Sequence, residues 1–175
     1  MKRKLIGFIF SVFLLICPLS AQIVFEEKPE NFKPKLEVAA CFIQVEDQVL
    51  FVKRLPNKPQ PNTWGIPGGK FDEGETATET VIREIQEETG IEIPEESMDY
   101  YGEVYIRYPE MDYTFHMFVY KPEEFPKVTI NPKEHADYTW VSLEEALKMP
   151  LIPGEEECIS LVYGNVVPSN IEHTS

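Results

Sequence analysis

The sequence contains few residues that could bind zinc or form disulfide bonds. Among its 175 residues are three cysteines and three histidines, and no two cysteines stand in a C-x-x-C pair. Structural zinc sites need clustered cysteine and histidine ligands, so a zinc-binding protein is not expected. Cys17 lies in the first 21 residues, and the sequence leaves open whether Cys41 and Cys158 pair in an oxidising compartment.

Basic residues are also scarce. The chain has 16 lysines and arginines against 30 aspartates and glutamates, which gives a net charge of -14. Proteins that bind nucleic acid neutralise its phosphates with lysine and arginine, so no nucleic-acid partner is expected. A small phosphorylated substrate remains compatible with this charge if a metal ion supplies the local positive charge.

An apolar run long enough for a comfortable membrane span is missing as well. Residues 2–4 are basic and residues 5–16 are apolar, but the apolar run is shorter than the ~20 residues of a spanning helix. Together with the small residue Ala21, this pattern predicts a secretory signal peptide over residues 1–21. We therefore expect an exported protein, periplasmic or secreted. The alternatives are a retained membrane anchor, with the membrane as a partner, and a cytoplasmic protein with an unusual start.

The remainder of the chain divides into a polar segment, one domain and a tail. Residues 22–35 are polar, contain Pro29 and Pro34 and are predicted to be a linker without a core of its own. Residues 36–167 are long enough for one domain with a single core. Residues 168–175 are expected to form a flexible tail.

Short β-prone runs recur along the predicted domain. They cover residues 38–43, 49–52, 98–107, 113–120 and 134–141. The first two runs are predicted to form a hairpin, and the first is almost continuously apolar, which suits a strand covered on both faces. The short apolar run at residues 158–163 is expected to pack on the edge of the domain.

Residues 69–91 carry the strongest local helix signals. Thr76 and Glu79 have the spacing of a capping box, in which each residue satisfies a backbone N–H of the other. The helix is therefore predicted to begin near Ala77. Gly90 is placed to end it in the left-handed conformation.

Three glutamates of this helix are predicted to share one face. Glu84, Glu87 and Glu88 stand at positions i, i+3 and i+4. Like charges at this spacing repel by roughly 0.2–0.5 kcal/mol per pair, and a hard divalent cation would remove the conflict. The alternative is an acidic helix face that is simply solvated.

The whole segment follows the pattern G-x5-E-x7-R-E-U-x-E-E-x-G-U, where U is aliphatic. Its fixed positions are filled by Gly69, Glu75, Arg83, Glu84, Ile85, Glu87, Glu88, Gly90 and Ile91. The chain therefore resembles the Nudix hydrolases. The resemblance implies an α/β (α+β) fold in which a mixed β-sheet lies between helices. It also implies Mg²⁺ as cofactor, with Mn²⁺ as a substitute.

The resemblance assigns roles beyond the three glutamates. The backbone carbonyl of Gly68 is expected to bind metal, and Lys70 to lie near the substrate phosphates. Arg54 precedes Gly68 by 14 residues, as a phosphate-contacting arginine does in the MutT branch, although a surface charge is the alternative. Glu134 is expected to be a further metal ligand or a general base, and the neighbouring His135 a bystander.

Within the helix, the resemblance assigns a supporting role to Arg83, which is expected to orient the neighbouring glutamates. Glu75 is expected to tie the loop to the helix, and Gly69 and Gly90 are structural positions. Either Glu84 or Glu134 is expected to accept the proton of the attacking water.

The predicted activity is hydrolysis of a diphosphate linkage in a nucleoside diphosphate derivative, by water that a metal ion activates. The substrate is left open between a nucleoside triphosphate, ADP-ribose, a nucleotide sugar and similar compounds, with the MutT-like features favouring a triphosphate. The alternative is a non-catalytic Nudix-like module that binds a nucleotide or a protein. A monomer and a homodimer are equally compatible with the sequence.

Overall fold

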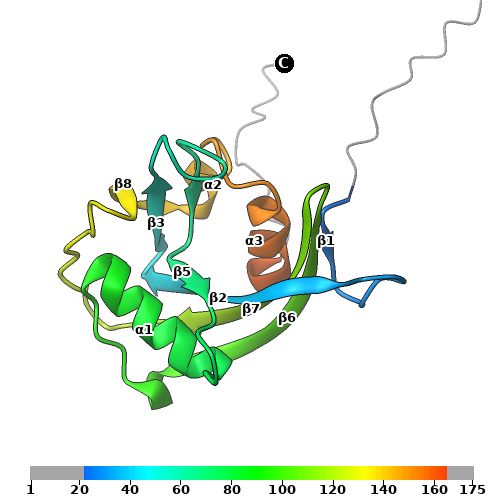
Figure 1. Ribbon diagram of the computed structural model, residues 1–175. Helices are drawn as coiled ribbons and strands as arrows, with labels where there is room; N and C mark the ends of the chain where they lie inside the picture. Colours follow the sequence, from blue (N-terminus) through cyan, green and yellow to red (C-terminus); the bar gives the residue numbers. More distant parts are fainter. Residues whose placement is uncertain (1–21, 165–175) are drawn as a thin grey trace, which may run out of the picture.

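The computed structural model describes residues 22–164 (Figure 1). Its strands are β1 Val24–Phe25, β2 Pro34–Val45, β3 Gln48–Arg54, β4 Trp64–Gly65, β5 Gly68–Lys70, β6 Met98–Tyr108, β7 Met111–Tyr120 and β8 His135–Ser142. Its helices are α1 Ala77–Thr89, the short 3-10 helix η1 Glu95–Ser97, α2 Leu143–Ala146 and α3 Glu155–Tyr163. The predicted signal peptide and the predicted tail at 168–175 lie outside the described residues. Over residues 22–164, none of the helices is long and apolar enough to cross a membrane.

Strand β2 organises a mixed sheet. It runs parallel to β7 and antiparallel to β3 and β5, while β6 pairs antiparallel with β7 and β8 with β3. The turn of the β2–β3 hairpin contains Glu46, which has a positive φ of 54°. The predicted strands are all present, and the predicted hairpin is confirmed.

Helices cover this sheet on both faces (Figure 1). Alternate residues of β2 point to opposite sides, as the pleat of a strand requires. Ala39, Cys41 and Ile43 pack in a buried cluster with α1, whereas Ala40 and Phe42 pack in a second cluster with α3. The predicted fold class, a mixed sheet between helices, is confirmed. Cys41 and Cys158 are free, and they belong to different clusters.

Residues 22–35 do not form a linker, so this prediction was wrong. Val24 and Phe25 pair with β6, and Val24 is only 6% exposed. Phe32 is also buried and packs edge-on against the ring of Tyr105. The few apolar side chains of this polar segment cover β6, and its backbone satisfies hydrogen-bonding groups at that edge of the sheet.

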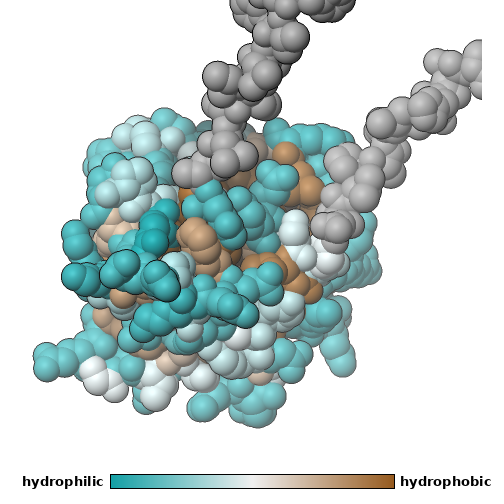
Figure 2. Space-filling view, turned by 90° about the vertical axis from the view of Figure 1, so that its right-hand side faces the viewer, coloured by the Kyte–Doolittle hydropathy of each residue, from teal (hydrophilic) through white to brown (hydrophobic). Residues whose placement is uncertain are grey.

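The C-terminal part of the domain is more ordered than the short edge run that the sequence predicts. Residues 155–163 form helix α3, and Cys158 and Ile159 are buried in the core. Glu156 and Glu157 are exposed in its first turn, where negative charge interacts favourably with the helix dipole. Seen from the side of α3 and β1, the described surface is mainly hydrophilic, with hydrophobic residues in smaller recessed areas (Figure 2).

Candidate active site

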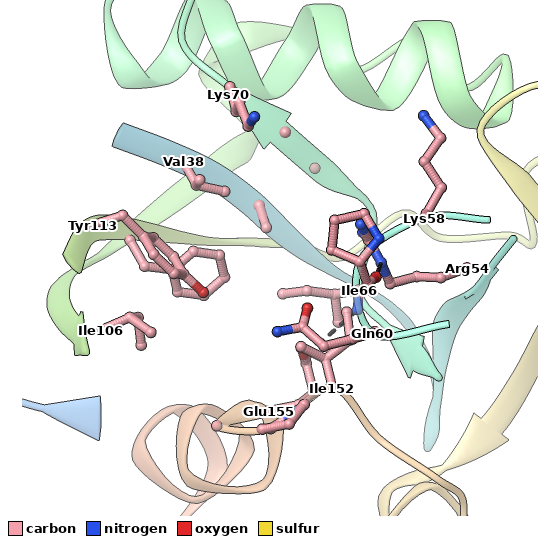
Figure 3. Close-up of a pocket in the computed structure, with 18 of the residues that line it drawn as sticks. Val38, Arg54, Lys58, Gln60, Ile66, Lys70, Ile106, Tyr113, Ile152 and Glu155 are labelled. Atoms are coloured by element: carbon pink, nitrogen blue, oxygen red, sulfur yellow. Dashed lines mark hydrogen bonds between the residues drawn. The ribbon is translucent and has the colours of Figure 1, made fainter. Parts of the chain in front are cut away.

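A pocket of about 800 Å³ lies between the sheet, helix α3 and the loop 55–63. Glu84 and Glu88 of α1 line one part of it, and aromatic side chains of β6 and β7 line another. Figure 3 shows that the lining side chains come from distant segments of the chain. The pocket is therefore large enough for a small organic ligand, with carboxylates at one end.

The limits of α1 are fixed by the predicted caps. The hydroxyl of Thr76 accepts a hydrogen bond from the Glu79 backbone N–H at 3.2 Å, and the Glu79 carboxylate accepts one from the Thr76 N–H at 2.8 Å. Gly90 has φ 70° and donates its N–H to the carbonyl of Gln86 at 2.9 Å. Both ends of the helix are thus as predicted.

The three glutamates of α1 do not all face the pocket. The side chains of Glu84 and Glu88 are 16% and 8% exposed and line the pocket, whereas that of Glu87 is 59% exposed. Successive residues of an α-helix are rotated by about 100° around its axis, so the adjacent Glu87 and Glu88 cannot both point the same way. Over the described part of the chain, no three Asp, Glu, His or Cys side chains come close enough to hold a metal ion by themselves.

Glu88 is held by two groups from other elements. One carboxylate oxygen, Oε2, accepts a hydrogen bond from the Gly68 N–H at 3.0 Å. The other, Oε1, lies 2.7 Å from Nε2 of His135, which is buried. This contact has the length of an ion pair but not hydrogen-bond geometry, so both ring nitrogens of His135 lack a hydrogen-bond partner. His135 thus contacts Glu88 inside the pocket, and the expectation that it is a bystander in the reaction stays a prediction.

Glu84 lies directly against the backbone of Gly69. A Cβ at position 69 would be 2.3 Å from the carboxyl carbon of Glu84, so only glycine leaves room for this carboxylate. Burial raises the pKa of the Glu84 carboxyl, and the hydrogen bond from Arg83 opposes this effect only in part. Gly68 is restricted as well, with φ 154° and no space for a Cβ beside the carbonyl of Ala39.

Arg83 connects the loop before α1 to the carboxylates. Its Nε and Nη2 donate to the two oxygens of Glu75 at 2.7 and 2.8 Å, and its Nη1 donates to Glu84 at 2.9 Å. Its Nη2 also donates to the carbonyl of Lys70 at 3.0 Å. The Arg83 guanidinium lowers the pKa of the Glu75 carboxyl to about 2. A bidentate ion pair of this kind fixes the orientation of both the guanidinium and the carboxylate.

Basic side chains line the pocket on the side of the loop 55–63. Arg54 donates its Nε to the carbonyl of Pro59 at 2.7 Å, which fixes its guanidinium at the start of this loop. Lys58 forms an ion pair of 2.7 Å with Glu134. Arg54, Lys58 and Glu134 line the pocket together with the exposed Lys70. Lys58 was not predicted, because a single lysine in a proline-rich loop gives no sequence signal.

A second residue that the sequence analysis missed is Glu155. It lies at the start of α3, is 6% exposed and accepts one long hydrogen bond, of 3.4 Å, from the N–H of Ile66. Burial raises the pKa of the Glu155 carboxyl to about 8. In the sequence it is one of three consecutive glutamates after Gly154, a pattern that is typical of a solvated helix start.

Comparisons with known proteins agree with this arrangement. A NUDIX domain family model matches residues 33–162. The CTP pyrophosphohydrolase of Escherichia coli (strain K12) is 30% identical over 122 residues, which cover 69% of this chain and 85% of that protein. The structure of the MutT protein from Methanosarcina mazei Go1 has a TM-score of 0.59 and 30% identity, and covers 72% of this chain and 89% of that one.

A further solved structure extends the similarity. The NUDIX domain of Shewanella oneidensis NrtR, complexed with ADP ribose, has a TM-score of 0.65 and 25% identity, and covers 78% of this chain and 92% of that one. The family match spans most of the sequence and includes every element that lines the pocket. The chain therefore belongs to the NUDIX domain family, and it is a pyrophosphohydrolase of the Nudix type, as residues 69–91 predict.

Proposed function

We propose that this pyrophosphohydrolase uses Mg²⁺ to cleave the diphosphate linkage of a nucleoside diphosphate derivative, and that a nucleoside triphosphate is its substrate. The observation that carries the proposal is the position of Glu84 and Glu88 in one pocket beside Gly68. The E. coli relative is named for a nucleoside triphosphate, CTP, which supports this choice. The pocket is large enough for a substrate of this kind.

The residues present fit a divalent cation. Two buried or half-buried carboxylates, Glu84 and Glu88, lie in the pocket, and a Cβ at Gly69 would fill the space that the Glu84 carboxylate occupies. Mg²⁺ is usually bound through one or two carboxylates together with substrate phosphates. Glu84, Glu88 and the Gly68 carbonyl would hold the ion. Glu87 would join them only after its exposed side chain turns towards the pocket.

A bound divalent ion supplies positive charge at the phosphate oxygens, where negative charge builds up during cleavage. The other roles in the reaction belong to residues of the protein. Water attacks phosphorus, one P–O bond forms, and the bond to the bridging oxygen breaks. Glu84 or Glu134 accepts the proton of the water. Arg83 holds the Glu84 carboxylate in place, and it cannot itself act as a base because its guanidinium stays protonated.

Lys58 of the loop 55–63, the adjacent Arg54 and Lys70 of β5 line the pocket and would bind the substrate phosphates. Lys58 is paired with Glu134. Both side chains of this pair are partly exposed, and such pairs contribute only about 0–1 kcal/mol. Lys58 can therefore exchange Glu134 for a phosphate oxygen at little cost.

The test is hydrolysis by the purified protein across nucleoside triphosphates, nucleotide sugars, dinucleoside polyphosphates and ADP-ribose, with and without Mg²⁺. We expect Mg²⁺-dependent product release from a nucleoside triphosphate, and a loss of at least about 100-fold in Glu84→Gln and Glu88→Gln. Glu92→Gln, at an exposed position just beyond the helix, is the matched control. Tight nucleotide binding without turnover across the whole panel would instead indicate the non-catalytic module.

A further inference from the structure

The end of the pocket away from α1 has its own chemistry. Its walls are the apolar side chains of β2 and β6 and the rings of Tyr108, Tyr113 and Phe115. The hydroxyl of Tyr108 donates to the carbonyl of Pro153 at 2.6 Å. Rings and flat apolar walls of this kind suit a planar aromatic ligand. The Nudix helix contributes no residue to this end.

Glu155 supplies a hydrogen-bonding group in these surroundings. Its carboxyl is buried and lines the pocket, yet its one hydrogen bond, from Ile66, is long at 3.4 Å. A buried polar group that is poorly paired costs free energy. Ile152 packs closely against Gly65: a Cβ on Gly65 would lie 2.5 Å from Cδ1 of Ile152. This packing encloses the Glu155 carboxyl further. The fold therefore buries the Glu155 carboxyl at a cost in free energy, in a position where a ligand could form a hydrogen bond with it.

Gln60 reaches the same space from the loop 55–63. Figure 3 shows its amide and the hydroxyl of Tyr113 pointing into the same part of the pocket. The backbone of Gln60 has φ 48°, a left-handed conformation that is uncommon for a residue other than glycine. A bond from the Thr63 hydroxyl to the Gln60 carbonyl, at 2.6 Å, holds the loop in this form. Strained positions of this kind occur often at ligand sites.

We propose that Glu155 and Gln60 are the specificity-determining residues of this enzyme, and that they bind the edge of a nucleobase that carries a hydrogen-bond donor and an acceptor on adjacent atoms. This proposal rests on the proposed function, because it assumes that the phosphates lie at Glu84 and Glu88. The base then lies against Tyr113 and Phe115, and its polar edge faces α3 and the loop.

The protonation of Glu155 decides which edge it can bind. Burial raises the pKa of its carboxyl to about 8, so the group is neutral at pH 7. A neutral carboxylic acid offers one O–H donor and one carbonyl acceptor side by side, whereas a carboxylate offers acceptors alone. The amide of Gln60 adds a second donor and acceptor. Glutamine at position 155 would reproduce the neutral acid at every pH.

The experiment compares kcat/KM for ATP, CTP, GTP and UTP with kcat/KM for inorganic tripolyphosphate, which has no base. In Glu155→Leu and in Gln60→Gly we expect the ratio for the preferred nucleotide to fall about 10- to 100-fold, mainly through KM. Glu155→Gln should retain the ratio within about threefold at pH 7. It should also retain it at pH 9, where the wild-type ratio falls about tenfold because Glu155 ionises.

Two substitutions serve as controls. Glu156→Gln changes the same type of side chain at the adjacent exposed position of α3. Asn62→Gly changes the same loop at another exposed residue with a positive φ, 61°. Both should leave the ratio unchanged. Calorimetric binding of AMP, CMP, GMP and UMP without metal gives a readout independent of turnover, and the preferred base should lose about tenfold or more in affinity in Gln60→Gly.

An unchanged ratio and unchanged monophosphate binding in both Glu155→Leu and Gln60→Gly would overturn the proposal. If Glu155→Leu does not fold, Gln60→Gly decides, because glycine adopts the left-handed conformation of position 60 without strain. Failure of the proposed function gives a different result: the wild-type protein then hydrolyses neither the nucleotides nor tripolyphosphate. Hydrolysis with no preference among the four bases would contradict the assignment of specificity while leaving the hydrolase intact.

Discussion

Substitution of Glu155 by glutamine is predicted to change how the stability of the protein depends on pH. The Glu155 carboxyl has an ordinary pKa of 4.5, and burial raises its pKa to about 8 in the folded protein. The folded state therefore binds this proton more tightly than the unfolded state does. The free energy of unfolding must then fall as pH rises from about 4.5 to about 8, and it must stop falling above that range.

The size of the effect follows from the same two values. One pH unit corresponds to ~1.4 kcal/mol, so the full interval from 4.5 to about 8 corresponds to about 5 kcal/mol. Between pH 5 and pH 8 the wild-type protein should lose about 3–4 kcal/mol relative to Glu155→Gln. Glutamine has nearly the same shape and does not ionise, so this cost is absent in the variant.

The assay is urea unfolding followed by circular dichroism at half-unit intervals from pH 5 to pH 9. The difference between wild type and Glu155→Gln isolates the one carboxyl, because every other side chain is common to both proteins. Glu156→Gln, at the exposed neighbouring position, should run parallel to wild type. Parallel curves for wild type and Glu155→Gln would refute the reasoning, since they would mean that Glu155 ionises in the folded protein as it does in water.

Three further predictions concern substitutions at positions 69, 75 and 83. Gly69→Ala should reduce kcat/KM by about 100-fold, because the new Cβ would lie 2.3 Å from the carboxyl carbon of Glu84 and displace this carboxylate. Gly74→Ala is the control: Gly74 has φ 87° and a Cβ there meets open space, so this variant should lose stability but retain activity. Arg83→Lys should reduce kcat by about tenfold or more, measured at saturating substrate, because lysine cannot bind both oxygens of Glu75 and also reach Glu84. The pKa of Glu75 is lowered to about 2, so the contribution of its carboxylate to stability is present above pH 4.5 and is lost as pH falls towards 2. The difference in unfolding free energy between wild type and Glu75→Gln should therefore shrink as pH falls from 4.5 to about 2 and remain constant above pH 4.5.

Features that depend on neighbouring residues could be predicted from the sequence. The capping box of α1 joins Thr76 to Glu79, and Gly90 ends the helix four residues after Gln86. The spacing of these residues is set by the helix itself, so a local pattern is sufficient. The almost continuous apolar run in β2 likewise showed that both faces of the sheet are covered.

Features that depend on distant residues could not be predicted in the same way. Lys58 meets Glu134 across 76 positions of sequence, and Ile66 meets Glu155 across 89. The spacing of Glu84, Glu87 and Glu88 predicted a shared face, but Glu87 lies about 100° from Glu88 around the helix and its side chain is 59% exposed. The linker prediction failed for a related reason, because the partner of Val24 is β6, more than eighty residues later.

Glu84 and Glu88 are proposed to hold a divalent cation together in the pocket. The most direct test is a titration with Mn²⁺ in which electron paramagnetic resonance measures the free ion, carried out on the wild type, Glu84→Gln, Glu88→Gln and the control Glu92→Gln in the presence of a nucleoside triphosphate. Each of the two pocket substitutions is expected to weaken Mn²⁺ binding by about tenfold or more, and the control is expected to bind like the wild type. Equal binding by all four proteins would contradict the proposal.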